Sequence, residues 1–326
     1  MSRRTADSEA TRGRRRLLVG TAFCVAAVLV VAGLASMGRI FGHPRSRVGG
    51  DAARGYHLPD PAEGDRIAAG LLGGAPAGPS GTPVPTISSE AVEPLPVSEP
   101  LRAAVIAPTP AIGALLHVGD GTEPAHFCTA TVVHSPNRNL VITAAHCVYG
   151  EAFASDIAFA PGYHDGFMPY GVWVPSRIDV DPRWVSDRDP AYDVAFLQMR
   201  RPGTGDRIEE VTGAEQVSFD SPVDRAARLI GYPDDEEQPI GCQNTTTALS
   251  DTQVRFDCAD FPDGTSGGPM LTDIDPANGR GTVIGVIGGY QEGGDDLTSY
   301  SSRFGPDIAT LYNRAGTADP TPTPTT

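Results

Sequence analysis

Apolar segments of strand length recur between residues 111 and 304. They are rich in Val, Ile, Leu, Thr and aromatic residues, and Gly, Pro, Asp and Asn separate them, which is typical of strands joined by turns. The expected strands are residues 111–118, 128–134, 140–145, 156–160, 171–175, 192–199, 227–232, 254–258, 282–290 and 299–304. Residues 307–316 instead place Ile308, Leu311 and Tyr312 on one helical face. The pattern predicts an all-β, antiparallel barrel or sandwich that ends in a short C-terminal helix.

One long apolar stretch, residues 17–37, lies ahead of this region and follows a basic N-terminus, residues 1–16. As a helix it is roughly 30 Å long, the thickness of a bilayer core. The positive-inside rule then keeps the N-terminus in the cytoplasm and exports everything after Met37. We expect a single-pass transmembrane signal-anchor with the folded domain outside the cell. The alternative is a signal peptide within residues 1–35, whose cleavage would release the protein.

Two other segments lack the pattern of strands or helices. Residues 38–104 are rich in Pro and Gly, and we expect a disordered linker there. Residues 317–326 form a Thr- and Pro-rich tail, which we also expect to be disordered. The folded domain is therefore expected within residues 105–316.

Composition narrows the choice of partners. The chain has 40 Asp and Glu against 25 basic residues, a formal net charge of −15. Such an acidic chain repels phosphate, so we expect no nucleic-acid partner. We expect a monomer that contacts the membrane through residues 17–37.

Four of the five cysteines follow the apolar stretch and fall in the exported part. Four cysteines allow three pairings, and proximity in sequence favours Cys128–Cys147 with Cys242–Cys258. Disulfides are the expected state in an exported domain. A zinc site is the alternative, but no CxxC pair or histidine cluster accompanies these cysteines. We therefore expect no metal and no cofactor.

Three short segments carry candidate catalytic residues. His146 lies in TAAHC, residues 143–147; Asp193 opens DVAFL, residues 193–197; Ser266 lies in DGTSGGP, residues 263–269. A serine hydroxyl needs a base within hydrogen-bond reach, and histidine has a suitable pKa. A buried carboxylate can fix the histidine tautomer. Backbone N–H groups in a glycine turn, here those of Gly264 and Ser266, can bind the oxyanion that forms.

In this order the three segments resemble those of the chymotrypsin-type (trypsin-like) serine endopeptidases. The overall sequence pattern is most similar to that of secreted bacterial members. The resemblance covers roughly residues 111–316 and includes Cys128-Thr129-Ala130 and Gly231-Tyr232-Pro233. It implies a double antiparallel β-barrel with the active site between the barrels. It also implies the roles of His146, Asp193 and Ser266 as a triad. Asp187 and Asp189 are rival acids, but the family places the acid directly before an apolar strand.

The first departure from the family concerns activation. Pancreatic members carry Asp directly before the nucleophile, where it pairs with a newly released N-terminus. Thr265 occupies that position here. Although Arg47-Val48-Gly49-Gly50 is similar to an activation site, we expect activity without a buried new N-terminus.

The second departure concerns the specificity pocket. Six residues before Ser266 lies Asp260, where trypsin-like members carry the acid that selects Arg or Lys. A solvated loop acid is the other interpretation, because the loop length differs from the pancreatic pattern. The resemblance places the pocket wall near residues Gly285, Val286, Ile287 and Gly288. A wall without histidine does not favour the Glu preference of glutamyl endopeptidases.

We therefore expect a serine-type endopeptidase that cleaves polypeptides through an acyl-enzyme intermediate. A non-catalytic binding module with the same fold, tethered at the cell surface, is the alternative. An esterase is disfavoured because the serine turn lacks the GxSxG pattern.

Overall fold

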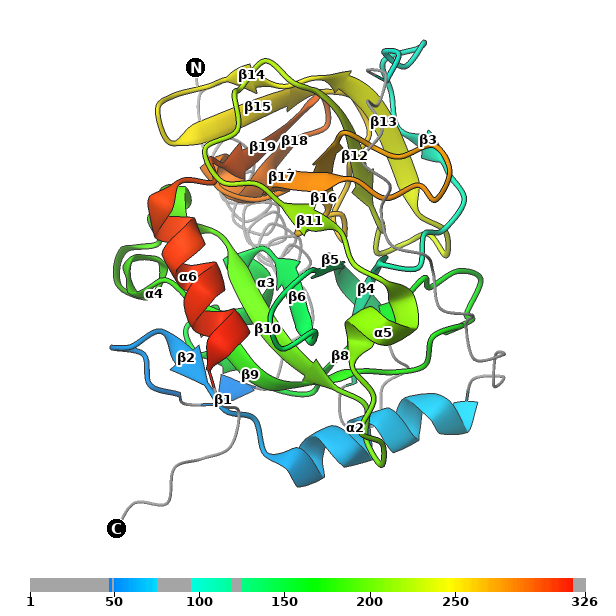
Figure 1. Ribbon diagram of the computed structural model, residues 1–326, viewed down its shortest axis with the longest axis vertical. Coiled ribbons are helices and arrows are strands. Elements are labelled where there is room, and N and C mark those ends of the chain that lie inside the picture. The colour runs from blue at the N-terminus through cyan, green and yellow to red at the C-terminus, as the bar shows by residue number, and fades with distance from the viewer. Residues whose placement is uncertain (1–46, 49, 75–94, 119–124, 319–326) are drawn as a thin grey trace, which may run out of the picture. The chain divides into compact units, whose positions relative to one another are not determined.

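Two β-barrels follow one another along the chain in the computed structural model, which describes residues 47–48, 50–74, 95–118 and 125–318 (Figure 1). The described residues all fall in one compact unit. The expected basic N-terminus, apolar stretch and last residues of the tail lie outside the described residues. No described helix is long and apolar enough to cross a bilayer.

The first barrel is built from a seven-stranded sheet. Its order is β2 (Tyr56–His57), β9 (Val174–Val180), β10 (Ala195–Arg200), β6 (Leu140–Thr143), β5 (Ala125–Val133), β4 (Ile112–His117) and β8 (Ile157–Pro161). Phe159 and Trp173 exchange backbone hydrogen bonds, which joins β8 to the segment before β9 and closes the barrel. Its core is lined by alternate strand residues such as Leu115, Val141 and Leu197.

The second barrel consists of two sheets. One has the order β11 (Gln216–Val217), β17 (Thr282–Val286), β16 (Pro269–Thr272), β12 (Ala226–Gly231), β13 (Ile240–Thr245) and β3 (Ala104–Val105). The other has the order β14 (Thr247–Ala248), β15 (Gln253–Asp257), β19 (Thr298–Ser302) and β18 (Gly294–Asp295). Leu229, Phe256 and Met270 lie in the core between them. The double β-barrel that the resemblance implies is therefore present.

Helix α6 (Pro306–Thr317) follows the second barrel and packs on the first. Its Ile308 and Leu311 are buried in a core cluster with Phe196 of β10, as the helical spacing predicts. Gln198 donates hydrogen bonds from Nε2 to the carbonyl oxygens of Ala315 and Ala318 at the helix end. The remaining short elements are β7 (Phe153–Ala154), α3 (Ala145–Val148), α4 (Pro182–Asp187), α5 (Ile208–Thr212) and the 3-10 helices Pro190–Tyr192 and Tyr290–Gly293.

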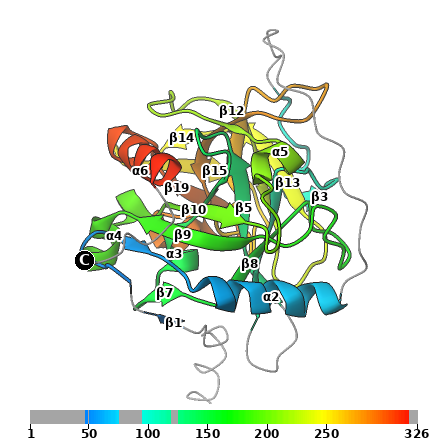
Figure 2. The same cartoon turned by 60° about the horizontal axis from the view of Figure 1, so that its bottom comes forward.

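The expectation of a disordered linker over residues 38–104 does not hold for the described part of that segment. Strand β1 (Arg47–Val48) pairs with β7. Strand β2 is an edge strand of the first barrel's sheet, and β3 is an edge strand of the second barrel's larger sheet. Helix α2 (Pro61–Gly74) lies along β8 and β9 (Figure 2). Its Ile67, Ala68 and Leu71 are buried. Burial of this apolar face outweighs the poor helix propensity of its four glycines.

Candidate active site

His146 and Asp193 meet at one end of the first barrel. His146 lies on α3, directly after β6, and Asp193 lies just before β10, the strand that pairs with β6. Nδ1 of His146 is 2.8 Å from Oδ2 of Asp193, and the backbone N–H of His146 donates to Oδ1 over 2.8 Å. Because an ionised carboxylate only accepts hydrogen bonds, this contact puts the ring proton on Nδ1 and leaves Nε2 of a neutral ring as the acceptor.

The second barrel also contacts Asp193, whose side chain is fully buried. The backbone N–H of Gly289 donates to Oδ2 over 2.8 Å. A Cβ on Gly288 would lie 3.0 Å from the same oxygen, so glycine permits this close approach. The rival acids are engaged elsewhere: Asp189 accepts from the N–H of Ala191, and Asp187 accepts from the hydroxyl of Ser186.

Ser266 lies in a tight glycine turn between β15 and β16. Gly264 and Gly267 have φ values of +90° and +81°, in the left-handed region that favours glycine. A Cβ on Gly264 would lie 2.3 Å from the N of Asp234, and one on Gly267 would lie 2.1 Å from Oγ1 of Thr143. Both glycines are therefore required by the turn and by its contacts.

The peptide groups of this turn have fixed directions. The carbonyl of Asp263 accepts from the N–H of Asp234 over 2.9 Å, and that of Thr265 accepts from the N–H of Gly268 over 2.9 Å. In a trans peptide the N–H points opposite to the carbonyl of the same group. The N–H groups of Gly264 and Ser266 therefore point away from these partners, and neither donates to another described residue.

The backbone of Ser266 contacts Thr129 and Cys147, and Cys147 is the residue after His146. The carbonyl oxygen of Ser266 accepts from the N–H of Thr129 over 2.7 Å and lies 3.8 Å from Sγ of Cys147. The hydroxyl of Ser266, which is half-buried, forms no hydrogen bond to another described residue. Catalytic hydrogen bonds are often long before substrate binds.

Thr265 is held by local contacts. Its side chain is buried, and its hydroxyl donates to the carbonyl oxygen of Pro262 over 2.6 Å. Its methyl side packs against Gly231, where a Cβ would lie 2.5 Å from Cβ of Thr265. The residue before the serine thus needs no ion pair to hold it.

The residues expected to form the specificity pocket belong to the second barrel, and they differ in how near they lie to the serine turn. Asp260 is an exposed loop residue whose carboxylate pairs with Arg102 over 2.6 Å. Residues Gly285 and Val286 belong to β17 and pair with β16. Ile287 exchanges backbone hydrogen bonds with the serine turn, and Gly288 lies against Asp193. The wall residues Ile287 and Gly288 therefore lie beside the serine turn and the acid, and the pocket that this segment was expected to line stays a prediction.

Residues 128–286 match the family model described as "Trypsin-like peptidase domain". Over 117 residues the chain is 29% identical to a protein of Bacillus subtilis (strain 168) named "Extracellular metalloprotease". That match covers 35% of this chain and 36% of the Bacillus protein, so it spans about a third of that relative.

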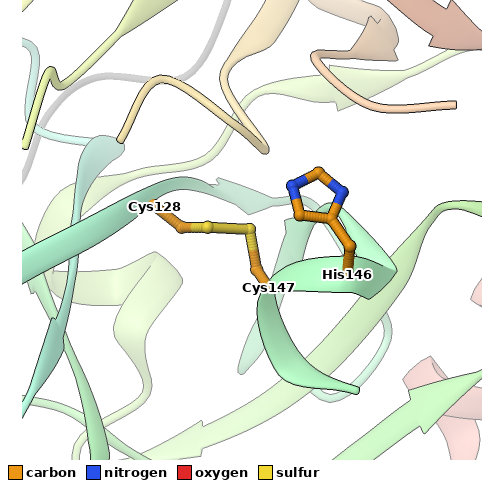
Figure 3. Close-up of side chains that lie close together, drawn as sticks. All are labelled: Cys128, His146 and Cys147. Atoms are coloured by element: carbon orange, nitrogen blue, oxygen red, sulfur yellow. A yellow bond between two sulfur atoms is a disulfide. The ribbon is translucent and has the colours of Figure 1, made fainter. Parts of the chain in front are cut away.

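The described residues do not fit a metal centre of the kind that this relative's name suggests. Within the described ranges, the one group of three potential ligands is Cys128, His146 and Cys147. Figure 3 shows that the two cysteines form a disulfide beside the imidazole, with an S–S distance of 2.02 Å. Neither sulfur is a thiolate, so neither can bind a metal ion as cysteine does. The second disulfide joins Cys242 to Cys258, and both are the pairings that sequence proximity favours.

Solved structures with the same fold match this chain over nearly all of their own length. A protease named Anisep from Arthrobacter nicotinovorans is 26% identical, with a TM-score of 0.58 over 66% of this chain and 100% of that one. A thermostable serine protease named AL20 is 25% identical, with a TM-score of 0.57 over 65% and 99%. A Glu endopeptidase is 18% identical with a TM-score of 0.53 over 67% and 97%, and this likeness concerns the fold alone. The chain therefore carries a trypsin-like serine peptidase domain of the chymotrypsin fold.

Proposed function

We propose that this protein is a serine endopeptidase that hydrolyses polypeptides with His146, Asp193 and Ser266. The hydrogen bond from Nδ1 of His146 to the buried Asp193, beside the glycine turn that carries Ser266, is the observation that supports it most directly. It leaves Nε2 as a base on the side of the ring away from the acid.

In the proposed reaction, Oγ of Ser266 attacks the substrate carbonyl and gives its proton to Nε2 of His146. Asp193 stabilises the imidazolium that results. The N–H groups of Gly264 and Ser266 bind the oxyanion of the tetrahedral intermediate. His146 then protonates the leaving amine, which leaves an acyl-enzyme. Water, activated by the same histidine, attacks the acyl group and restores Ser266.

A fluorophosphonate probe tests the assignment, because it reacts with an activated serine whatever the substrate preference. Wild-type protein should be labelled and should hydrolyse a peptide library, and Ser266→Ala should lose both properties. His146→Ala should slow labelling by several orders of magnitude. Ser250→Ala removes an exposed serine hydroxyl and serves as the matched control. Full labelling of Ser266→Ala would reject the assignment, and an unreactive wild-type protein would favour the binding module.

We also propose that the peptidase domain is exported and tethered through residues 17–37. Two disulfides in the described domain support an oxidising compartment. Fractionation of expressing cells, followed by N-terminal sequencing, tests this. A membrane-bound chain with its original N-terminus is expected, and a shed chain that begins near residue 36 would indicate a cleaved signal peptide instead.

A further inference from the structure

We propose that Thr129 is a positioning residue whose hydroxyl holds the oxyanion-binding turn against the first barrel. The proposal rests on the proposed function. Thr129 lies on β5, next to Cys128, and its side chain is fully buried. Among the described residues, none of its hydrogen bonds goes to His146 or Asp193. Any effect of Thr129 on the reaction therefore passes through the serine turn.

The hydroxyl of Thr129 links two segments of the second barrel. It donates to the carbonyl oxygen of Gly264 over 3.1 Å and accepts from the backbone N–H of Tyr232 over 2.8 Å. Tyr232 begins the loop in which the N–H of Asp234 holds the carbonyl of Asp263. One hydroxyl therefore connects the turn that carries the Gly264 N–H with the loop that orients this group.

The backbone of Thr129 adds a second point of attachment. Its N–H donates to the carbonyl oxygen of Ser266 over 2.7 Å, and its own carbonyl accepts from the hydroxyl of Thr143 over 2.8 Å. The carbonyls of residues 264 and 266, on either side of the Ser266 N–H, are thus both held by one residue. This arrangement limits rotation of the peptide group that presents the N–H.

Loss of the hydroxyl would leave two backbone groups without a partner. Tyr232 is fully buried and Gly264 is buried, so neither group has water to replace Thr129. A shift of the turn that gives these two groups new partners would also move the neighbouring peptide groups, which carry the two proposed oxyanion donors. Such a movement weakens binding of the transition state more than binding of the substrate.

Thr131 provides a matched control on the same strand. It is also fully buried, but its hydroxyl has no hydrogen-bond partner among the described residues. Thr131→Val and Thr129→Val are the same change in shape at two buried sites of β5. Only Thr129→Val removes contacts to the serine turn.

The test measures kcat and KM of the full chain on one good peptide substrate, with the active fraction determined by fluorophosphonate titration. Thr129→Val should lower kcat by about 10- to 100-fold, somewhat less than the loss of a whole oxyanion donor, and should change KM less than threefold. Thr129→Ser keeps the hydroxyl and should retain kcat within about threefold. Thr131→Val should keep both constants.

Equal kcat for Thr129→Val and Thr131→Val would overturn the proposal, as would a loss in Thr129→Ser as large as that in Thr129→Val. If Thr129→Val does not fold, Thr129→Ala takes its place, because it differs from Thr129→Ser only in the hydroxyl. Failure of both to fold, beside a fully active Thr129→Ser, would assign the hydroxyl to folding alone and would also overturn the proposal. If wild-type protein itself cleaves nothing and takes up no probe, the proposed function fails; an active wild type with unaffected Thr129→Val rejects the role of Thr129 alone.

Discussion

The backbone N–H of Gly289 lies 2.8 Å from Oδ2 of Asp193, the oxygen that also contacts Nδ1 of His146. Asp193 and His146 belong to the first barrel, and Gly289 follows β17 of the second. The position of the acid therefore depends on how the two barrels meet, not on the first barrel alone.

Gly288→Ala tests this dependence. The added methyl would lie 3.0 Å from Oδ2 of Asp193 and 3.3 Å from Cβ of Ala144, so the carboxylate must shift. We expect kcat to fall by up to about 10²-fold, since small displacements of catalytic groups have effects of this size. Gly70→Ala, which adds a methyl where nothing lies within 4 Å, is the control and should leave kcat unchanged. Steady-state kinetics on one peptide substrate decide it, and an unaltered kcat in Gly288→Ala would contradict the prediction.

Helix α2 should contribute to the stability of the peptidase domain. Leu71 is 3% exposed and Leu72 is 51% exposed, so the two neighbours form a matched pair. Leu71→Ala should lower the free energy of unfolding by about 2–5 kcal/mol, because it leaves a cavity against the first barrel. Leu72→Ala should change it by less than about 0.5 kcal/mol. Urea unfolding followed by fluorescence measures both, and equal small effects would mean that α2 does not pack as described.

Glu215 should make stability depend on pH. Burial raises the pKa of Glu215 to about 7 from an ordinary value of 4.5, although the N–H of Gly281 and the charge of Arg280 lower it in part. The folded protein therefore holds this proton more tightly than the unfolded chain does. The free energy of unfolding should fall by roughly 3 kcal/mol as the pH rises from about 4.5 to about 7, and level off above it.

Glu215→Gln should remove this loss, because the amide stays neutral and its oxygen can still accept from Gly281. The free energy of unfolding of the variant and of wild type is measured by urea unfolding at pH 5 and at pH 7.5, and the difference between the two proteins is compared at the two pH values. Glu236→Gln, at an exposed position, is the control and should follow the wild type at both pH values. A difference between Glu215→Gln and wild type that is the same at both pH values would show that Glu215 does not titrate in this range.

The activity should not require a free N-terminus at Val48. Thr265 is neutral and is held by Pro262 and Gly231, so a new amino group has no carboxylate at that position to pair with. A chain that begins at Val48 and one that carries a tag ahead of Val48 should have equal kcat within about twofold. Loss of oxyanion donors would instead cost about 10²–10³ in kcat, so the outcomes separate clearly. A tagged chain that gains activity only on removal of the tag would show zymogen-like activation.

The sequence predicted best those features that are set by residues close together in the chain. The segments of His146 and Asp193 predicted a pair that the structure joins by a hydrogen bond, and the spacing of Ile308 and Leu311 predicted α6. Strand β9 was predicted at 171–175 but runs from Val174 to Val180. Trp173 instead bridges to Phe159, and the charged but buried Arg177 and Asp179 interrupt the apolar pattern of the strand's second half.

Features that depend on distant parts of the chain were missed. The partners of the Thr129 hydroxyl are 103 and 135 residues away, and no local pattern marks that residue for such a role. Helix α2 was missed because its Gly and Pro content outweighed the spacing of Ile67 and Leu71, although Asp60 before Pro61 is a helix-start signal and accepts from the N–H of Ala62.

Helix α6 has a consequence for the order of events during synthesis. Its residues come last in the domain, yet they cover Phe196 and Gln198 of the first barrel. A ribosome releases the strands of the first barrel long before it releases α6, so this surface stays uncovered until the whole second barrel has emerged. Chains that stop before Pro306 should therefore be aggregation-prone intermediates that chaperones and cellular proteases recognise. The native domain should form only after its last helix is free to dock.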